Sequence, residues 1–176
     1  MRKRLILATL ALAGAMALSG CGGSKSASKN GKILTIEEGP DVETIDPALN
    51  QAADGANYIT MLSDNLLRLD KDGKIAPSLA EKYEVSDDGL TWTFHLRDGL
   101  KWSDGSDFKA GDFVYSWQRM VDPEVAAPYA ETMLGMVEGY KDAIGNTDAN
   151  GNTTTTPDVT KLKVEAPDDK TFVVHM

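Results

Sequence analysis

Apolar and polar residues alternate most clearly on either side of the sequence Asp87-Asp88-Gly89. Successive side chains of a β-strand point to opposite faces of the sheet, so residues that alternate in this way share one face. Asp and Gly favour the backbone conformations of a tight turn. The segment 83–96 therefore predicts a β-hairpin with one buried face. The apolar residues of that face are Tyr83, Val85, Leu90, Trp92, Phe94 and Leu96.

A second hairpin is predicted at the carboxyl end of the sequence, and a short strand at 33–36. Apolar residues alternate before and after the turn sequence Pro167-Asp168-Asp169-Lys170, and the sequence stops at Met176 inside the second apolar run. Natural domains seldom finish abruptly inside an apolar strand, because a bare strand edge favours pairing with other chains. We therefore expect the last strand to be an edge strand that was cut rather than completed.

Helical spacing of apolar residues predicts three helices, over residues 55–68, 112–121 and 130–144. In the second of these segments, Asp112 stands near the positive end of the helix dipole, where a carboxylate is favourable. The following segment, 145–157, is polar and rich in Asn and Thr. We interpret it as a long surface loop.

The first twenty residues have the pattern of a secretory signal peptide. Basic residues at positions 2–4 precede an uncharged run over residues 5–18, shorter than the about 20 apolar residues of a membrane-spanning helix. The sequence Leu-Ser-Gly-Cys that ends at Cys21 resembles the bacterial lipobox, whose cysteine receives a diacylglycerol. The alternative is an ordinary signal peptide followed by an unmodified cysteine. We expect a lipid anchor at Cys21 and a flexible tether over residues 22–32.

Composition and charge limit the kinds of partner. The chain has 27 acidic and 18 basic residues, and three of the basic ones belong to the predicted leader. An acidic surface repels nucleic acid and anionic lipid headgroups, so we expect neither as a partner. Cys21 is the only cysteine, which favours a modification site over a disulfide.

No catalytic or metal-binding constellation is visible in the sequence. The two histidines, His95 and His175, have no second ligand at suitable spacing, so we interpret them as solvent-facing residues of strands. Residues 148–152 faintly resemble a calcium loop, but Thr153 and Val159 stand where Gly and Glu are required. We therefore expect no enzyme activity, no cofactor and no metal.

Aromatic residues offer the clearest candidates for a binding site. Trp92 and Trp117 lie on the apolar faces of predicted elements, so we expect them in the core. Tyr129 differs, because it follows a proline in a predicted loop and belongs to neither apolar stripe. A loop tyrosine offers a ligand an apolar ring and one hydroxyl, with surface or core packing as the alternative.

Several stretches of the sequence resemble the family 5 extracellular solute-binding proteins. The most specific are residues 91–105 (TWTFHLRDGLKWSDG) and 112–123 (DFVYSWQRMVDP), and the second is similar to the oligopeptide-binding branch. Shorter matches occur at residues 44–47 (TIDP), 77–83 (PSLAEKY) and 127–130 (APYA). The resemblance runs in the family's order over nearly all of residues 33–176.

The resemblance implies an α/β (α+β) fold, with an antiparallel or mixed sheet and packed helices. This would be the N-terminal part of a bilobal, type II periplasmic-binding-protein fold. After the leader (1–20) and the tether (21–32), residues 33–60 would begin the large lobe and residues 61–176 would form a small second domain. The return through the large lobe and a third domain would be missing.

The resemblance also implies ligand-binding residues. The tyrosine of the Pro-Tyr-Ala motif lines the peptide site of the oligopeptide-binding branch, which assigns Tyr129. A loop at 50–54 would contact the peptide backbone and assigns Gln51 and Ala53. A Glu occupies the position of Gln51 in a well-known member of the branch, so the charge of that contact differs here.

The implied function is that of a receptor tethered by lipid outside the cytoplasm, on the cell membrane or in the periplasm. It would be a monomer that delivers oligopeptides to the permease subunits of an ABC importer. Three alternatives stay open: a sensor of peptide signals, a binder of another solute on the same fold, and a truncated remnant that does not transport. A tethered peptidase has no support beyond the export signal.

Overall fold

The computed structural model describes residues 34–36, 39, 41–148 and 153–176. The chain divides into two compact units, Met1–Glu37 and Glu38–Met176, and all described helices and strands belong to the second. The predicted leader, Cys21 and the predicted tether lie outside the described residues. None of the described helices has the length and apolar character needed to cross a membrane.

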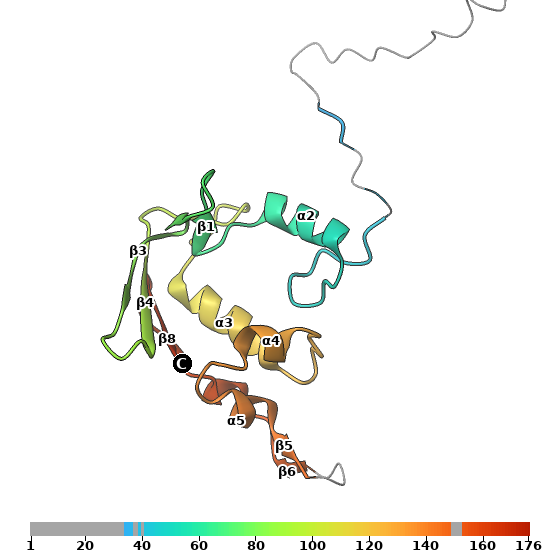
Figure 1. Cartoon of the computed structure of the whole chain (residues 1–176), viewed down its shortest axis with the longest axis vertical. Helices are drawn as coiled ribbons and strands as arrows, with labels where there is room; N and C mark the ends of the chain where they lie inside the picture. The colour runs from blue at the N-terminus through green and yellow to red at the C-terminus, as the bar shows by residue number, and fades with distance from the viewer. Residues whose placement is uncertain (1–33, 37–38, 40, 149–152) are drawn as a thin grey trace, which may run out of the picture. The chain divides into compact units, whose positions relative to one another are not determined.

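The second unit alternates short helices with antiparallel strands (Figure 1). In chain order its elements are α2 (Ala53–Leu62), β1 (Leu67–Leu69), β2 (Ile75–Pro77), β3 (Ala80–Val85), β4 (Thr91–Leu96), α3 (Ala110–Val121), α4 (Ala130–Leu134), α5 (Tyr140–Ile144), β5 (Asn146–Thr147), β6 (Thr153–Thr155), a 3₁₀ turn (Val159–Lys161), β7 (Val164–Asp168) and β8 (Thr171–His175).

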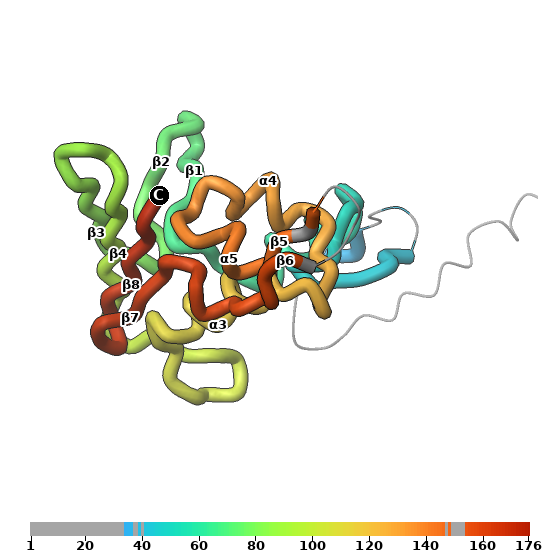
Figure 2. Tube along the Cα trace, turned by 90° about the horizontal axis from the view of Figure 1, so that it is seen from below, coloured from blue at the N-terminus to red at the C-terminus, as the bar shows by residue number. Residues whose placement is uncertain are grey.

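Both predicted hairpins are confirmed, and together they form one four-stranded sheet. The predicted face of the first hairpin is buried only in part, because Phe94 and Leu96 are buried whereas Tyr83, Val85 and Leu90 are exposed. The strand order of the sheet is β3-β4-β8-β7, with every neighbouring pair antiparallel (Figure 2). In the register, Phe94 lies opposite Phe172 and Trp92 lies opposite Val174. The apolar faces of the two hairpins therefore merge into one continuous surface.

The expectation that the last strand is an edge strand is wrong. Strand β8 lies between β4 and β7, and beyond it the Met176 N–H donates to the Leu90 carbonyl at 2.8 Å. Its apolar alternation explains this position, because Phe172 and Val174 are buried. A strand with a buried face is best placed where neighbours cover both of its edges.

The strand predicted at 33–36 is also not found. Ile33 lies outside the described residues, and Leu34 to Ile36 have no strand conformation. A strand is stabilised by hydrogen bonds to a neighbouring strand, and no strand of the described part pairs with this segment. β-Propensity alone does not form a strand without such a partner.

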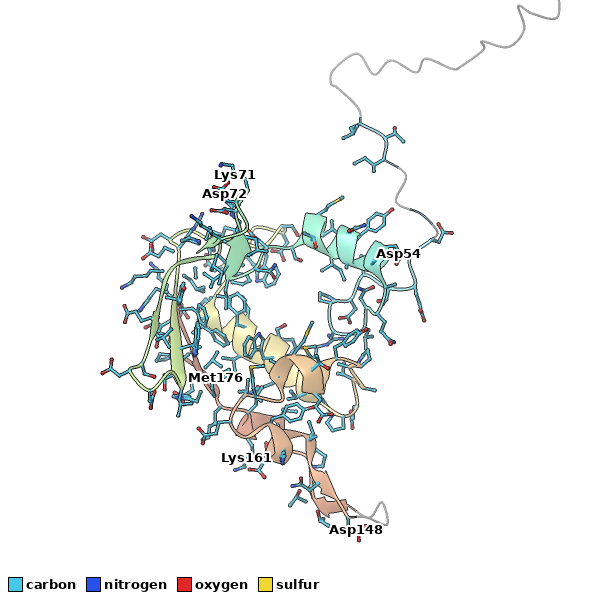
Figure 3. The ribbon with its side chains drawn as sticks, in the orientation of Figure 1. Asp54, Lys71, Asp72, Asp148, Lys161 and Met176 are labelled. Carbon is cyan, nitrogen blue, oxygen red and sulfur yellow. The ribbon has the colours of Figure 1, made fainter. Side chains whose placement is uncertain are left out.

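Helix α2 confirms the first predicted helix, but it ends at Leu62 rather than at residue 68. Ser63 ends it with an extended backbone while its N–H and hydroxyl both donate to the Ile59 carbonyl. The apolar residues that follow belong instead to the β1–β2 hairpin, whose turn contains Gly73 at a φ of 73°. Figure 3 shows Lys71 and Asp72 at the tip of that hairpin.

Helix α3 confirms the helix predicted over residues 112–121, and it covers one face of the sheet (Figure 1). Phe113 and Trp117 both place their rings 5.3 Å from the ring of Phe172, which is fully buried. At the start of the helix the Asp112 carboxylate accepts the Lys109 N–H at 2.9 Å. These contacts fix the helix on the sheet and so fix the residues on its opposite side.

The single helix predicted over residues 130–144 is two helices, α4 and α5. Gly139 separates them with a φ of 78°, and a Cβ at this position would overlap the Lys161 carbonyl. Only glycine fits here, because the backbone is left-handed and the Lys161 carbonyl leaves no space for a side chain. A left-handed residue interrupts an α-helix, so one helix cannot continue through Gly139. The predicted loop 145–157 contains the short β5–β6 pair.

The two histidines lie in strands and face carboxylates. His95 Nε2 lies 3.5 Å from Glu84 Oε1, and His175 Nε2 lies 3.5 Å from Glu165 Oε1. Within the described ranges, no three His, Cys, Asp or Glu residues are close enough to hold a metal ion. Part of the calcium-like segment lies outside those ranges.

Candidate functional site

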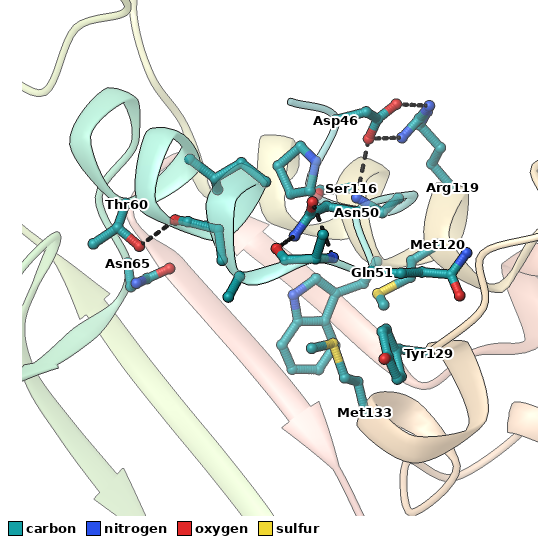
Figure 4. Close-up of a pocket in the computed structure, with 17 residues that line it drawn as sticks. Asp46, Asn50, Gln51, Thr60, Asn65, Ser116, Arg119, Met120, Tyr129 and Met133 are labelled. Carbon is teal, nitrogen blue, oxygen red and sulfur yellow. Dashed lines mark hydrogen bonds and ion pairs between the residues drawn. The ribbon is translucent and has the colours of Figure 1, made fainter. Parts of the chain in front are cut away.

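A pocket of about 650 Å³ lies between the start of α2 and the exposed sides of α3 and α4 (Figure 4). This volume is within the range of about 300–1,000 Å³ that is typical of small-ligand sites. The loop before α2, the helix itself and residues of α3 and α4 contribute its walls. The lining residues are Asp46, Pro47, Ala48, Asn50, Gln51, Ala52, Ala53, Ala56, Ile59, Thr60, Asn65, Ser116, Trp117, Arg119, Met120, Tyr129 and Met133.

All three residues that the sequence assigns to a ligand site line this pocket. Gln51 is in the loop before α2, Ala53 is the first residue of α2, and Tyr129 is the residue before α4. The fold thus brings together positions more than seventy residues apart in the sequence. Their contact with a ligand stays a prediction.

The loop before α2 is held by its own hydrogen bonds. Its first turn is built on Asp46, whose N–H donates to Thr44 Oγ1 and whose carboxylate accepts the Ala48 N–H, both at 3.0 Å. Its second turn is built on Asn50, whose amide donates to the Ala52 carbonyl at 2.9 Å. The backbone around Gln51 therefore has a defined course into the helix.

Gly55 lets this loop fold back onto the start of α2. A Cβ at Gly55 would overlap the side-chain oxygen of Asn50 and would lie 2.9 Å from the Thr44 carbonyl. Gly55 is also the one residue of α2 that is buried. The close approach requires a residue without a side chain, and it gives the pocket one firm wall.

An ion pair ties the same loop to α3. Arg119 donates from Nη1 to Asp46 Oδ1 at 3.1 Å and from Nη2 to Asp46 Oδ2 at 2.6 Å (Figure 4). This two-bond geometry is the strong form of an arginine–carboxylate contact. The hydrogen bond from Arg119 lowers the pKa of Asp46, with help from the Ala48 N–H and against the opposing effect of burial.

Sequence reasoning missed the pairing of Asp46 with Arg119. Each residue stands in a stretch that carries the family resemblance, Asp46 in 44–47 and Arg119 in 112–123. Their complementary charges are compatible with a contact but do not predict it, because the two residues are 73 positions apart in the sequence.

The apolar end of the pocket is formed by Trp117, Met120, Tyr129 and Met133. In Figure 4, Gln51, Met120, Tyr129 and Met133 lie together at one end, and Thr60 and Asn65 lie at the other. Trp117 was expected in the core. It packs edge-on against the buried Phe172 and also lines the pocket. Tyr129 is 42% exposed, so its ring is accessible from the pocket.

Polar side chains with free hydrogen-bonding groups stand beside the apolar end. In the described part of the chain, the side chains of Gln51, Asn65 and Ser116 make no hydrogen bond to other protein groups. The side chains of Asn50 and Thr60, in contrast, donate to the backbone carbonyls of Ala52 and Ala56. The amide of Gln51 can therefore both donate to a ligand and accept from it.

Comparison with known protein families decides the class of this molecule. The model of the bacterial extracellular solute-binding proteins, family 5, matches residues 74–176, which is more than half of the chain. The chain belongs to this family. The sequence-based prediction is thereby confirmed, including its similarity to the oligopeptide-binding branch.

Individual relatives match more of the chain than the family model does. The periplasmic oligopeptide-binding protein OppA of Haemophilus influenzae is 38% identical over 143 residues, which cover 81% of this chain and 25% of OppA. The probable deoxycholate-binding periplasmic protein YgiS of Escherichia coli is 38% identical over 145 residues, covering 82% of this chain and 26% of YgiS. The chain thus spans about a quarter of the length of these curated relatives.

A solved family 5 structure confirms the fold class. The crystal structure of Haemophilus influenzae OppA in complex with the peptide RPPGFSPFR aligns with a TM-score of 0.68 and 40% sequence identity. The alignment covers 78% of this chain and 25% of that chain. This family 5 chain therefore has part of a type II periplasmic-binding-protein fold, with mixed helices and antiparallel sheets.

Proposed function

We propose that this chain is the N-terminal part of a lipid-anchored receptor that binds oligopeptides outside the cytoplasm and delivers them to the permease of an ABC importer. One observation carries the proposal: the pocket unites Gln51, Ala53 and Tyr129, the residues that family resemblance assigns to the peptide. The receptor binds as a monomer without turnover and uses no cofactor. The boundary at residue 60 between a large and a small lobe is part of the same proposal.

The geometry of the pocket suits an extended peptide. A peptide backbone offers donors and acceptors in every residue, and the free amide of Gln51 matches either kind. The ring of Tyr129 offers an apolar surface beside it. A second lobe that closes over this pocket would exclude water and strengthen these hydrogen bonds.

Calorimetric titration tests the proposal for the ligand. The receptor is titrated in parallel with a mixture of tripeptides and with deoxycholate. We expect heat of binding from the peptides only. Saturable binding of deoxycholate without peptide binding would refute the proposal.

A different solute on the same fold is the second candidate. The similarity to YgiS, which is named as a probable deoxycholate-binding protein, favours this candidate. The apolar end of the pocket would contact the ring system of such a ligand. The peptide-sensing alternative shares the site with the transport receptor, and deletion of the permease separates the two, because only transport requires it.

Lipid anchoring at Cys21 has its own test. Cells that express the protein are labelled with radioactive palmitate, and Cys21→Ser serves as the control. We expect label in the unsubstituted protein and none in the variant. Equal labelling of the two proteins, or no label in either, would remove the anchor from the proposal.

The relation to a longer receptor is tested in the genome. Because the chain matches about a quarter of its relatives, we propose that the reading frame continues beyond the codon for Met176. An open frame of several hundred codons would agree with this. A stop codon would favour the remnant that does not transport.

A further inference from the structure

The charges of the pocket cancel each other. Asp46 and Arg119 are the charged residues among those that line it, and they bind each other through two hydrogen bonds. Neither is left to neutralise a charge on a ligand. An ionised ligand group in this part of the site would lose water without gaining a partner, which is costly.

The wall of the pocket beside Gln51 is apolar and deformable. Met120 is half-buried on α3, and Met133 is an exposed residue of α4 in the turn that follows Tyr129. Methionine side chains are unbranched and polarizable, so they adapt to ligands of different shape and pack well against aromatic rings. Tyr129 adds a ring that can stack on another aromatic group.

The polar and apolar groups of the pocket suit two different parts of a bound peptide, its backbone and a side chain. The free amide of Gln51 lies at the same end of the pocket as Met120, Tyr129 and Met133 (Figure 4). A backbone bonded to Gln51 would therefore direct a neighbouring side chain against the methionines. The pocket volume of about 650 Å³ accommodates a side chain as large as phenylalanine with its backbone.

The geometry points to a specificity site: this pocket takes an uncharged, apolar side chain of the bound peptide, with Met120, Tyr129 and Met133 as its selecting wall. The inference rests on the proposed function, since it assumes that the ligand is a peptide. It adds a preference among peptides, which recognition of the backbone alone does not supply.

Methyl NMR of the complete receptor, of which this chain is the proposed N-terminal part, tests this preference. The methionines carry ¹³C-methyl groups, and the probes are tripeptides Ala-X-Ala with X as Phe, Leu, Ala, Glu or Lys. The ring of the Phe peptide should shift the methyl signals of Met120 and Met133 and leave that of Met61 unchanged. We expect half-saturation at about tenfold lower concentration for Phe and Leu than for Glu and Lys.

A matched pair of variants assigns the effect to the wall. Met133→Glu places a charge in the pocket, and Met136→Glu places one three residues away, outside the pocket lining. Both side chains are mostly exposed, 57% and 61%, so neither variant buries a carboxylate and both should fold. We expect Met133→Glu alone to abolish the preference for Phe and to favour Lys.

The outcomes separate the two levels of the proposal. Equal half-saturation for all five peptides, or an unchanged preference in Met133→Glu, would overturn the specificity inference and leave peptide binding intact. No shift with any peptide up to about 10 mM, where even ligands of about −3 kcal/mol bind measurably, would overturn the proposed function and the inference with it.

Discussion

Arg119 lines the pocket, yet both of its terminal nitrogens bind the Asp46 carboxylate. From the sequence alone, an arginine in a binding cleft suggests a partner for the carboxylate of a ligand. The geometry gives it a different role, which is to tie the loop of Gln51 to α3. The family resemblance assigns Gln51, Ala53 and Tyr129 to the ligand site, but the pairing of Asp46 with Arg119 across 73 residues follows only from the fold.

Tyr129→Ala is the most direct test at the residue scale. We expect the substitution to weaken peptide binding by the receptor about tenfold, the typical effect of losing an aromatic contact. Tyr115→Ala is the matched control, because Tyr115 is 70% exposed on α3 and does not line the pocket. Calorimetry of both variants decides the point, and equal affinities would remove Tyr129 from the site.

Asp46→Asn should reveal the ion pair through its pH dependence. Because Arg119 lowers the pKa of Asp46 in the folded protein, its stabilising effect is present above the unfolded pKa of about 3.9. That effect is lost as the pH falls through the lower, folded pKa. We expect the variant to be about 1 kcal/mol less stable at pH 7, with a difference that shrinks in strong acid.

Urea unfolding at pH 7 and at about pH 2 measures this difference. Asp122→Asn serves as the control, since among the described residues the Asp122 carboxylate accepts only the Glu124 N–H and forms no ion pair. A deficit for Asp46→Asn that is unchanged at low pH would show that the charge of Asp46 does not stabilise the loop.

At the scale of elements, period-two alternation was the most reliable signal. Residues 83–96 and 162–176 predict both hairpins, because a buried face leaves only one register that hides its apolar residues. Their order in the sheet, β3-β4-β8-β7, was not predictable, since it depends on how the two hairpins meet. The strand predicted at 33–36 is not found for the complementary reason: its residues have β-propensity, but no strand of the described part of the chain pairs with them.

The break between α4 and α5 shows a second limit of local patterns. Apolar spacing over residues 130–144 is compatible with one helix, and Gly139 alone does not forbid it in the sequence. The carbonyl of Lys161, twenty-two residues further on, occupies the space that a side chain would need. The break is thus a tertiary contact that the sequence marks only with a glycine.

Gly139→Ala should therefore be strongly destabilising. We expect a loss of at least about 2 kcal/mol, from the left-handed backbone conformation together with the overlap at Lys161. Gly73→Ala has a similar φ, 73° against 78°, but open space around its Cβ, so it should lose only about 1 kcal/mol. Equal unfolding free energies in urea for the two variants would contradict the close approach.

At the scale of the whole molecule, the sequence motifs identify the family, whereas the fold brings the residues of the site together. The run of residues 91–123 identifies the family without any geometry. Gln51, Ala53 and Tyr129 converge only because α3, seated on the sheet by Phe113 and Trp117, supports both the loop and α4. The methionine wall was not predictable, since its members come from two helices.

Several large apolar side chains of the second unit are exposed, among them Tyr58, Met61 and Leu62 of α2 and Leu69 and Ile75 of the β1–β2 hairpin. Exposed apolar area of this kind lowers the stability of a small domain and favours association. We therefore expect residues 22–176 alone to be marginally stable and to bind the dye ANS. A sharp, cooperative thermal transition without ANS binding would contradict this expectation.

The central claim is that the protein is a receptor for peptides, and the ligand that it carries from the cell tests this most directly. The protein is purified from its native membrane without denaturation, and native mass spectrometry identifies what remains bound. We predict a mixture of short peptides in which apolar residues are enriched at one position. A bile acid or another single small solute in place of peptides would contradict the account.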